Sequence, residues 1–589
     1  MQRMTTWARF LVIAIVVAET YWVADHFHYA MKSATSRAAT ITPNFIFDNG
    51  VGENLPPKER SLFDQLTLDG GAGQQIPFPF SKLLQSLSKA GGCRLDDGRA
   101  CFQSVLIPLG RSLQRTAAAP DFFKFPRHVV AFTGEPSGRE NFPLFKDRLY
   151  LGYQEKARLI EVISFNETAG RFEFQLVKNY DANSMPRVVY ANRFVCSSCH
   201  QNQTPIFSRQ VWDETNANPA IAKRLAEPRK AFDGAPVRIG IDVPNALDDS
   251  TDRANLLPAY NLLWREGCKG NRRCRAHALT AALQYRLTGE RGFYYGSTNF
   301  QKEFLAVFAK NWLRNWPDGI KIPSNDIPNR DPLQFANSER LAHVPARFEA
   351  LLPRGHKEIW QWETDRFRLI KGIGEFFSSE DIRAIASKIG YSNASTKSLD
   401  QVLRDPAFAN LDRAIQAMNQ AALNDDSIRH SLLRDAVFQA LGIDPGKRCC
   451  DDQSSPQPQS DDIATSTRAT GEMGLNLFYV HCARCHATQE PFPPNFLSGD
   501  AAQVTKKLRN CADRIFFRLG MWQLSPSARP KTPMPPEAML PMQSEQWFAS
   551  ESVAQMRKYV LPYVNAELKK QPDAWLGLSY ESLPRCTLH

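Results

Sequence analysis

The stretch Arg171-Phe-Glu-Phe-Gln-Leu-Val177 alternates polar and apolar residues with a period of two. Because successive side chains of a β-strand point to opposite faces, this pattern predicts a strand with one face in a core. Residues 148–153 and 159–163 have comparable patterns, so residues 126–195 are expected to be rich in strands.

The pattern becomes helical from about residue 255 to residue 445. A spacing of four drifts about 40° per step around an α-helix, so rings at that spacing cannot all share one narrow seam. We expect a helix with a broad buried face that ends before Pro317, with a wall of rings beside a cofactor as the alternative. The aromatic residues at this spacing are Phe300, Phe304, Phe308, Trp312 and Trp316.

Together these patterns indicate an α+β chain that is mainly α with a β-rich segment. A chain of 589 residues is too long for one hydrophobic core, so several domains are expected. The predicted segments are a signal peptide or N-terminal membrane anchor (1–35), a mixed α/β domain (36–250), a helical middle domain (251–448), a polar linker (449–467) and a C-terminal domain (468–589).

The N-terminus resembles an export signal. Arg3 and Arg9 precede a short apolar run, residues 10–18, as in the charged start and apolar middle of such a signal. The run is short for a membrane span of about 20 residues, and no clear small-x-small cleavage site follows, so an uncleaved anchor is the alternative. We expect the chain in the periplasm or on the outer face of the cytoplasmic membrane of a bacterium.

The formal net charge is +11. A basic surface favours acidic proteins, anionic lipid or nucleic acid as partners. Export excludes nucleic acid, so the expected partner is an acidic redox protein, with a membrane tether through the N-terminal apolar run as a further possibility.

The chain has 12 cysteines, of which two close pairs suit short-range disulfides in an oxidising compartment. Cys93 and Cys101 are eight residues apart, and Cys268 and Cys274 are six apart. Buried free thiols are the alternative. Four further cysteines could supply two more bridges with undetermined pairing, namely Cys449, Cys450, Cys511 and Cys586.

A Cys-x-x-Cys-His motif occurs twice, as Cys196-Ser-Ser-Cys199-His200 and as Cys482-Ala-Arg-Cys485-His486. A redox dithiol or a disulfide does not explain the histidine, and a zinc site would need four ligands from two motifs nearly three hundred residues apart. Covalent haem attachment explains all three residues: two thiols form thioethers with the vinyl groups, and the imidazole binds the iron. The sequence therefore predicts two covalently attached haem c groups, with His200 and His486 as iron ligands.

The second motif has companions on both sides. Gly474, Phe478 and Cys482 are spaced by four, which places them on one helical face. Pro494-Asn-Phe-Leu-Ser-Gly499, Pro533-Met-Pro-Pro536 and an amphipathic segment at 550–560 follow. In this order they resemble a class I cytochrome c domain over about residues 468–565.

This resemblance implies an all-α domain with His486 as the proximal iron ligand and Met534 as the distal one. It also implies that a proline carbonyl near 493–494 orients the histidine. Met539 and Met542 are rivals for the distal position, and core packing is the alternative role for Met534. Ala487 departs from the family, which usually has glycine there. His/Met ligation fills both axial positions and suits electron transfer.

The first motif lacks such companions, so its distal ligand stays open. For each histidine that could fill this position, an ordinary place in the core or on the surface is the alternative to iron binding. His481 is expected on the helix that carries the second motif. The distal candidates for the first motif are His128, His277, His343 and His356.

Two haems on one exported chain resemble, in arrangement only, the di-haem cytochrome c peroxidase group and its oxygenase relatives. In that group one haem passes electrons and the other activates peroxide or oxygen. The wider spacing of the motifs and the β-rich lead-in are unlike that group. The first hypothesis is therefore an exported electron-transfer cytochrome. The second is a peroxidase- or oxygenase-type enzyme with the first haem as active site, and the third is a binding protein that the haems only stabilise.

Overall fold

The computed structural model describes most of the chain from residue 59 onward, and all described residues belong to one compact unit within residues 45–589. The expected leader or anchor and nearly all of the expected linker lie outside the described residues. So do His343, Met542, Cys449 and Cys450. Within the described ranges, no helix combines the length and the apolar character that a membrane span needs. The described ranges are 59–69, 73–93, 101–136, 141–209, 214–238, 242–334, 345–392, 398–447, 459–460, 473–488, 493–540, 547, 550–569 and 580–586.

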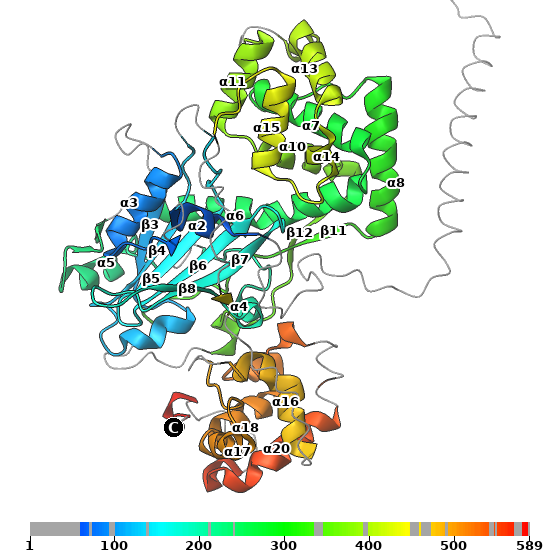
Figure 1. Cartoon of the computed structure of the whole chain (residues 1–589). Coiled ribbons are helices and arrows are strands. Elements are labelled where there is room, and N and C mark those ends of the chain that lie inside the picture. The colour runs from blue at the N-terminus through cyan, green and yellow to red at the C-terminus, as the bar shows by residue number, and fades with distance from the viewer. Residues whose placement is uncertain are drawn as a thin grey trace, which may run out of the picture. The chain divides into compact units, whose positions relative to one another are not determined.

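Six antiparallel strands form a meander in which consecutive strands are neighbours (Figure 1). The strands expected around 148–153, 159–163 and 171–177 are confirmed. A two-residue strand, β13 (Gln459–Ser460), adds to the sheet parallel to its last strand. The six strands are β3 (Phe102–Ile107), β4 (Arg127–Phe132), β5 (Leu149–Gln154), β6 (Leu159–Asn166), β7 (Arg171–Lys178) and β8 (Arg187–Tyr190).

The two faces of the sheet are covered differently. Helices α2 (Leu62–Thr67) and α3 (Phe80–Ala90) share a core with one face, to which Val130 and Leu151 belong. Tyr150 on the opposite face belongs to the largest core, together with helix α6 (Asp242–Leu262). Because side chains alternate along a strand, residues two apart share the face toward α6.

The largest core continues from the sheet into the helical region. Helix α6 runs through the boundary expected at 250/251, and its Leu247 and Leu257 lie in the same core as residues of the later helices. The main helices of this region are α7 (Arg272–Leu287), α8 (Ala306–Asn315), α10 (Arg368–Gly374), α11 (Ser379–Ile389), α13 (Pro406–Ala417), α14 (Gln420–Asn424) and α15 (His430–Ala440).

The five spaced aromatic rings are buried, as expected, and they form one continuous row, which was not expected. Neighbouring rings have centroids 5.0–5.8 Å apart, and each side chain is at most 9% exposed. The row begins in a π-helical turn, Phe300–Leu305, whose i→i+5 hydrogen bonds give more residues per turn than an α-helix. That turn offsets the drift expected from α-helical geometry, and α8 then ends at Asn315, before Pro317.

The described residues from 473 onward form helices and loops around a hydrophobic core of their own. A Cβ atom at Gly474 would lie 2.6 Å from Cδ2 of Tyr559. The helix that contains Gly474 and the helix that contains Tyr559 therefore cross at a point where glycine leaves room. The Phe478 and Tyr559 rings are 6.0 Å apart at the same crossing. The helices are α16 (Met473–His486), α17 (Ala501–Asn510), α18 (Ala512–Gly520) and α20 (Glu551–Val560).

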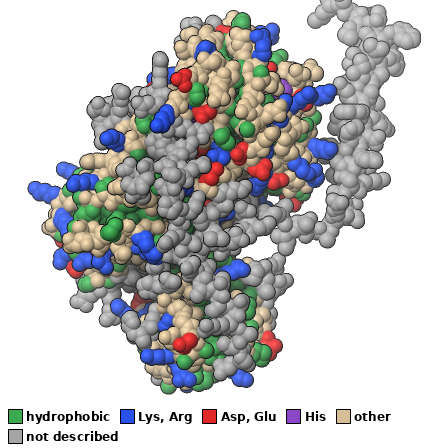
Figure 2. All heavy atoms as spheres, viewed as in Figure 1, with side chains coloured by type: hydrophobic (Ala, Val, Ile, Leu, Met, Phe, Trp, Pro, Cys, Tyr) green, Lys and Arg blue, Asp and Glu red, His purple; other side chains and the backbone are tan. Residues whose placement is uncertain are grey.

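The surface shown in Figure 2 carries Lys and Arg side chains spread among Asp and Glu, without one large basic patch. This face of the described chain does not single out a docking area for an acidic partner.

Candidate functional site

The first Cys-x-x-Cys-His motif lies at the end of a short helix that follows the sheet directly. Helix α4 (Arg193–Cys199) begins at Asn192, whose side-chain oxygen accepts hydrogen bonds from the backbone N–H groups of Phe194 and Val195. An asparagine at this position starts a helix because it satisfies N–H groups that have no helical partner. The two motif thiols therefore lie three residues apart on α4, with His200 at its C-terminal end.

The His200 ring is oriented by a backbone carbonyl. Its Nδ1 lies 2.9 Å from the carbonyl oxygen of Thr204. Because a carbonyl only accepts hydrogen bonds, Nδ1 carries the proton and Nε2 is the nitrogen free to bind a metal. Burial lowers the pKa of His200 to about 4, so the imidazole is neutral at pH 7. The Phe174 ring of β7 lies 5.4 Å from the imidazole ring.

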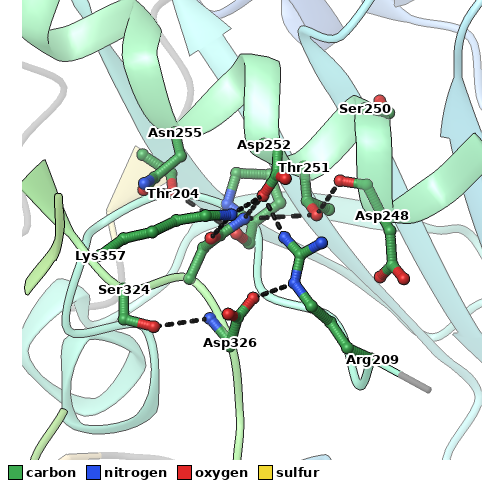
Figure 3. A network of polar contacts seen from close by, with 12 residues as sticks. Thr204, Arg209, Asp248, Ser250, Thr251, Asp252, Asn255, Ser324, Asp326 and Lys357 are labelled. Carbon is green, nitrogen blue, oxygen red and sulfur yellow. Dashed lines mark hydrogen bonds and ion pairs between the residues drawn. The ribbon is translucent and has the colours of Figure 1, made fainter. Parts of the chain in front are cut away.

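The loop that supplies this carbonyl is fixed to α6. The Asn255 side-chain oxygen on α6 accepts hydrogen bonds from the Asn202 amide at 2.9 Å and the Thr204 hydroxyl at 3.0 Å. All three side chains are almost fully buried. The Asn255 amide in turn donates to the carbonyl of Pro323 at 2.9 Å. Figure 3 shows Thr204 and Asn255 at one side of this polar network.

Charged residues hold the other end of the loop. Arg209 forms ion pairs with Asp252, one turn before Asn255 on α6, and with Asp326 (Figure 3). Lys357 also pairs with Asp252, at 2.6 Å. The neighbouring Asp248 has its pKa raised to about 7, mainly by burial. The loop from His200 to Arg209 is therefore anchored at both ends, which limits movement of the Thr204 carbonyl.

A cavity of about 240 Å³ opens beside the motif. A cavity needs about 10–15 Å³ to hold one water, so this one has room for a sizeable ligand. Cys196, Cys199 and His200 line it, facing the sheet. Apolar residues that line it include Val129, Leu159, Ile163, Phe174, Leu176 and Phe207.

Covalent attachment of a macrocycle would need two thiols and a metal-binding nitrogen beside a cavity, and this site brings these groups together. Cys196 and Cys199 are not joined in a disulfide. Burial raises the pKa of the Cys196 thiol to about 12. These residues could therefore hold a covalently attached haem.

Of the histidines considered as second ligands, the three that the structure describes do not line this cavity. His128 lies on the opposite face of the sheet, where its ring is 5.1 Å from that of Phe80 and burial lowers its pKa to about 3. His277 lies on α7, and His356 is exposed on strand β12 (His356–Trp360). Among the described residues that line the cavity, His200 is the one histidine, and none is a methionine.

An ion pair lies on the sheet face of the cavity. Arg127 on β4 reaches over β5 to Glu161 on β6, with Nη2 2.5 Å from Oε2. The hydroxyl of Ser112 donates to the same carboxylate at 2.9 Å. Gly152 on β5 makes this crossing possible, because a Cβ atom there would overlap the Arg127 guanidinium. Sequence reasoning missed this pair, although a glycine inside a strand signals a close approach of another group.

The second motif repeats the arrangement of the first. Helix α16 ends at His486, whose Nδ1 lies 2.7 Å from the carbonyl oxygen of Pro494. The expected orientation of this histidine by a proline carbonyl is thus confirmed. Burial lowers the pKa of His486 to about 4, and its ring stacks on Phe496 at 4.3 Å. His481 lies on α16, as expected, with its ring 6.0 Å from that of Trp547.

Met534 lies in a loop held by hydrogen bonds on both sides of the residue. Its N–H donates to the carbonyl of Arg518 at 3.3 Å, and its carbonyl accepts from the Trp522 indole at 3.1 Å. The side chain is half-buried. Its rival Met539 ends a single 3-10 turn, Glu537–Met539, and is also half-buried. The backbone of Met534 is thus held through both its N–H and its carbonyl, and that of Met539 through its N–H, which donates to the carbonyl of Pro536 at 2.9 Å.

The two motif helices are in contact. The Asn192 side-chain amide donates to the carbonyl of Arg484 at 2.6 Å, and the Arg484 guanidinium lies 5.2 Å from the centroid of the Phe194 ring. Thr488 and Pro493, which follow the second motif, also line the cavity beside the first. Groups attached to the two motifs would therefore be close neighbours.

A buried ion pair provides a second contact. Lys531, three residues before Met534, lies 2.5 Å from Glu349, and the N–H of Thr532 also donates to Glu349. Both charged side chains are at most 7% exposed. Burial by itself would raise the pKa of Glu349, but the positive charge of Lys531, together with smaller effects, outweighs burial and holds the pKa below its ordinary value. Next along the chain, Ala350 lines the cavity and Arg354 donates to the carbonyl of Cys199 at 2.5 Å.

The cysteines divide into two groups. Cys93–Cys101 and Cys268–Cys274 form the disulfides expected from their spacing. Cys511 and Cys586 form a third disulfide across 75 residues. The four described cysteines outside any disulfide are all motif residues, namely Cys196, Cys199, Cys482 and Cys485.

In the described part of the chain, no three His, Cys, Asp or Glu side chains come together as ligands for a single metal ion. A haem iron needs no such group from the protein, because the porphyrin supplies four of its ligands. Comparison with known proteins gives no match to a family model, to a curated protein or to a solved structure.

Proposed function

We propose that the chain is a c-type cytochrome that holds one haem at Cys196, Cys199 and His200 and a second at Cys482, Cys485 and His486, and that it transfers electrons between them. One observation carries this proposal. In both motifs a backbone carbonyl accepts from Nδ1 of the histidine, which leaves Nε2 free beside two thiols that are not in a disulfide. The other described cysteines are all in disulfides.

The second site is proposed to be a class I cytochrome c domain. The crossing of α16 and α20 at Gly474, the Pro494 carbonyl on His486 and the fixed Met534 loop support this proposal. Met534 would then fill the distal position, so that the second haem serves electron transfer.

The proposed electron transfer is supported by the contact between the motif helices. A haem at each motif would supply one-electron redox chemistry. The residues of this chain hold the two attachment helices together through Asn192 and Arg484 and exclude water with apolar walls.

A second candidate function is a peroxidase- or oxygenase-type oxidoreductase with its active site at the first motif. The observation that favours it is the cavity, whose described lining offers no second histidine or methionine beside His200. The ion pair between Arg127 and Glu161 in the same cavity gives it polar groups that a pure electron carrier would not need.

We also propose export to a bacterial periplasm or the outer face of its cytoplasmic membrane, and an acidic redox protein as partner. Three disulfides are compatible with an oxidising compartment. The net charge of +11 is the basis of the proposed partner.

The test is the haem content of the full chain, made in a bacterium that attaches c-type haem. We expect a pyridine haemochrome spectrum of two haems per chain, colour that resists acid acetone, and a mass increase of two haems. The double variant Cys196→Ala/Cys199→Ala should keep one haem, whereas Ser198→Ala inside the same motif should keep both. A colourless chain, or colour fully extracted by acid acetone, would refute the proposal.

A further inference from the structure

We propose that Arg127 and Glu161 form a binding site for small weak acids, of the class of hydrogen peroxide, beside the first motif. Glu161 accepts the proton of the incoming molecule, and the Arg127 guanidinium pairs with the resulting anion. This inference rests on the proposed haem at Cys196, Cys199 and His200.

The pair is built into the sheet rather than formed by chance on the surface. Glu161 lies directly opposite Gly152 in the register of β5 and β6, and Arg127 crosses over that glycine to reach it. Ser112 donates to the carboxylate from outside the sheet. Three strands and a loop therefore fix the positions of the two charges.

The surroundings make the pair unusual. Val129, Leu159 and Ile163 lie on the same sheet face and line the same cavity. The charges of the pair therefore stand out on a mainly apolar sheet face. Their place beside candidate cofactor ligands makes them the candidate contact for a polar ligand in this cavity.

A second ion pair in the cavity shows the contrast with a structural role. Arg111 donates to the carbonyl of Phe348 at 2.9 Å and pairs with Glu214 at 3.1 Å, and Glu214 also binds Arg330. These side chains are at most 4% exposed and are used in holding loops together. Arg127 and Glu161, by contrast, are 26% and 22% exposed, so a ligand in the cavity can reach both charges.

The cavity places the pair close to the motif. Arg127 and Glu161 line the same cavity as Cys196, Cys199 and His200. Both charges therefore share a cavity with the residues that would hold the first haem.

The proton balance is complete without another reactant. A weak acid HX and the Glu161 carboxylate give the anion X⁻ and the neutral Glu161 carboxylic acid. Once the Glu161 carboxylate is neutral, it no longer balances the positive charge of Arg127. The anion X⁻ then balances that charge. No electron is transferred in this step.

The test measures cyanide binding to the haem-loaded full chain through the change in its absorption spectrum. At pH 7 cyanide is mainly HCN, a weak acid. In Glu161→Gln we expect cyanide association about tenfold slower or more, because the base is lost while the shape is kept. In Arg127→Gln we expect a weaker complex that dissociates about tenfold faster or more. Ser112→Ala, which removes only one hydrogen bond to Glu161, should have a smaller effect in the same direction.

Glu135→Gln is the matched control. The Lys146–Glu135 pair is 29% and 23% exposed, close to the values of the Arg127–Glu161 pair, and neither residue lines the cavity. Cyanide binding should be unchanged in this variant. The control separates the loss of this pair from the loss of a similarly exposed ion pair in the connection between β4 and β5.

The outcomes separate the two proposals. Two haems in all variants, with cyanide binding equal to that of the unmodified chain, would overturn the weak-acid site and leave the cytochrome proposal intact. A change in haem content or midpoint potential alone would also overturn it, because the pair would then only contact the porphyrin carboxylates. Absence of haem from the unmodified chain would refute the cytochrome proposal itself.

Discussion

The side-chain amide of Asn192 donates to the backbone carbonyl of Arg484 at 2.6 Å, while its side-chain oxygen caps helix α4. One residue therefore starts the first motif helix and binds it to the second. Two attachment sites 286 positions apart in the sequence are thus linked by a single side chain.

Asn192→Ala should lower stability by about 1 kcal/mol through the lost cap and slow electron transfer between the proposed haems. Stability is measured by urea unfolding, and transfer by flash reduction. Asn218→Ala, which removes the cap of helix α5 (Pro219–Ala226), is the control. It should cost similar stability without slowing transfer, and equal slowing in both variants would argue against the proposed coupling.

Gly152→Ala should displace Arg127 from Glu161, because the added Cβ overlaps the guanidinium. We expect destabilisation of about 1–3 kcal/mol, typical of overpacking, together with weakened cyanide binding at the first site. Gly355→Ala places its Cβ in open space and should change neither property. Unchanged thermal unfolding of Gly152→Ala would mean that Arg127 has another position of similar energy.

Lys531→Ala should destabilise the chain by about 3–5 kcal/mol, because it leaves the buried Glu349 carboxylate without its partner. Asp121→Asn, which breaks an exposed pair with Lys124, should be nearly neutral. Urea unfolding at pH 7 measures both.

The same ion pair predicts a pH dependence. Because the pKa of Glu349 is held below its ordinary value of 4.5, its contribution to the free energy of unfolding is complete above that value and is lost as the pH falls below it. The unmodified chain should lose more stability between pH 6 and pH 3 than Glu349→Gln does. Parallel curves for the two would show that the pair does not carry this dependence.

Asn255→Ala should loosen the Thr204 carbonyl that orients His200. We expect a shifted midpoint potential and altered electron paramagnetic resonance signals of the first proposed haem, with those of the second unchanged. Asn311→Ala, which removes a buried asparagine bonded to the carbonyl of Gly267, is the control for a general packing loss. It should leave both haem signals as they are.

Met534→Ala should abolish the sulfur-to-iron charge-transfer band of the oxidised chain. Met539→Ala should keep it. If the band survives in Met534→Ala and disappears in Met539→Ala, the distal ligand is Met539.

The sequence was informative where the signal is local. Alternation in residues 171–177 predicted a strand, and the short separations of Cys93–Cys101 and Cys268–Cys274 predicted their bridges. The order of residues around His486 predicted the proline carbonyl that contacts it. In each case the partners are close in the chain, so few alternative arrangements compete.

The sequence could not reveal contacts that depend on register or on distant packing. Arg127 and Glu161 meet because β4, β5 and β6 align in one register. The sequence of a single strand does not specify that register. Asn255 reaches Thr204 from 51 residues away through the placement of α6. The row of aromatic rings was predicted to be buried, but the π-helical turn that aligns it has no clear mark in the sequence.

Helix α6 contributes Leu247 and Leu257 to a core that also holds Tyr150 of the sheet and Leu279 of α7. Cutting the gene anywhere near codon 250 would expose apolar surface on both fragments, and each would tend to aggregate. The strands that face the first motif and the helices that share their core should therefore unfold as one cooperative unit. The first motif would then become exposed to solvent in a single transition.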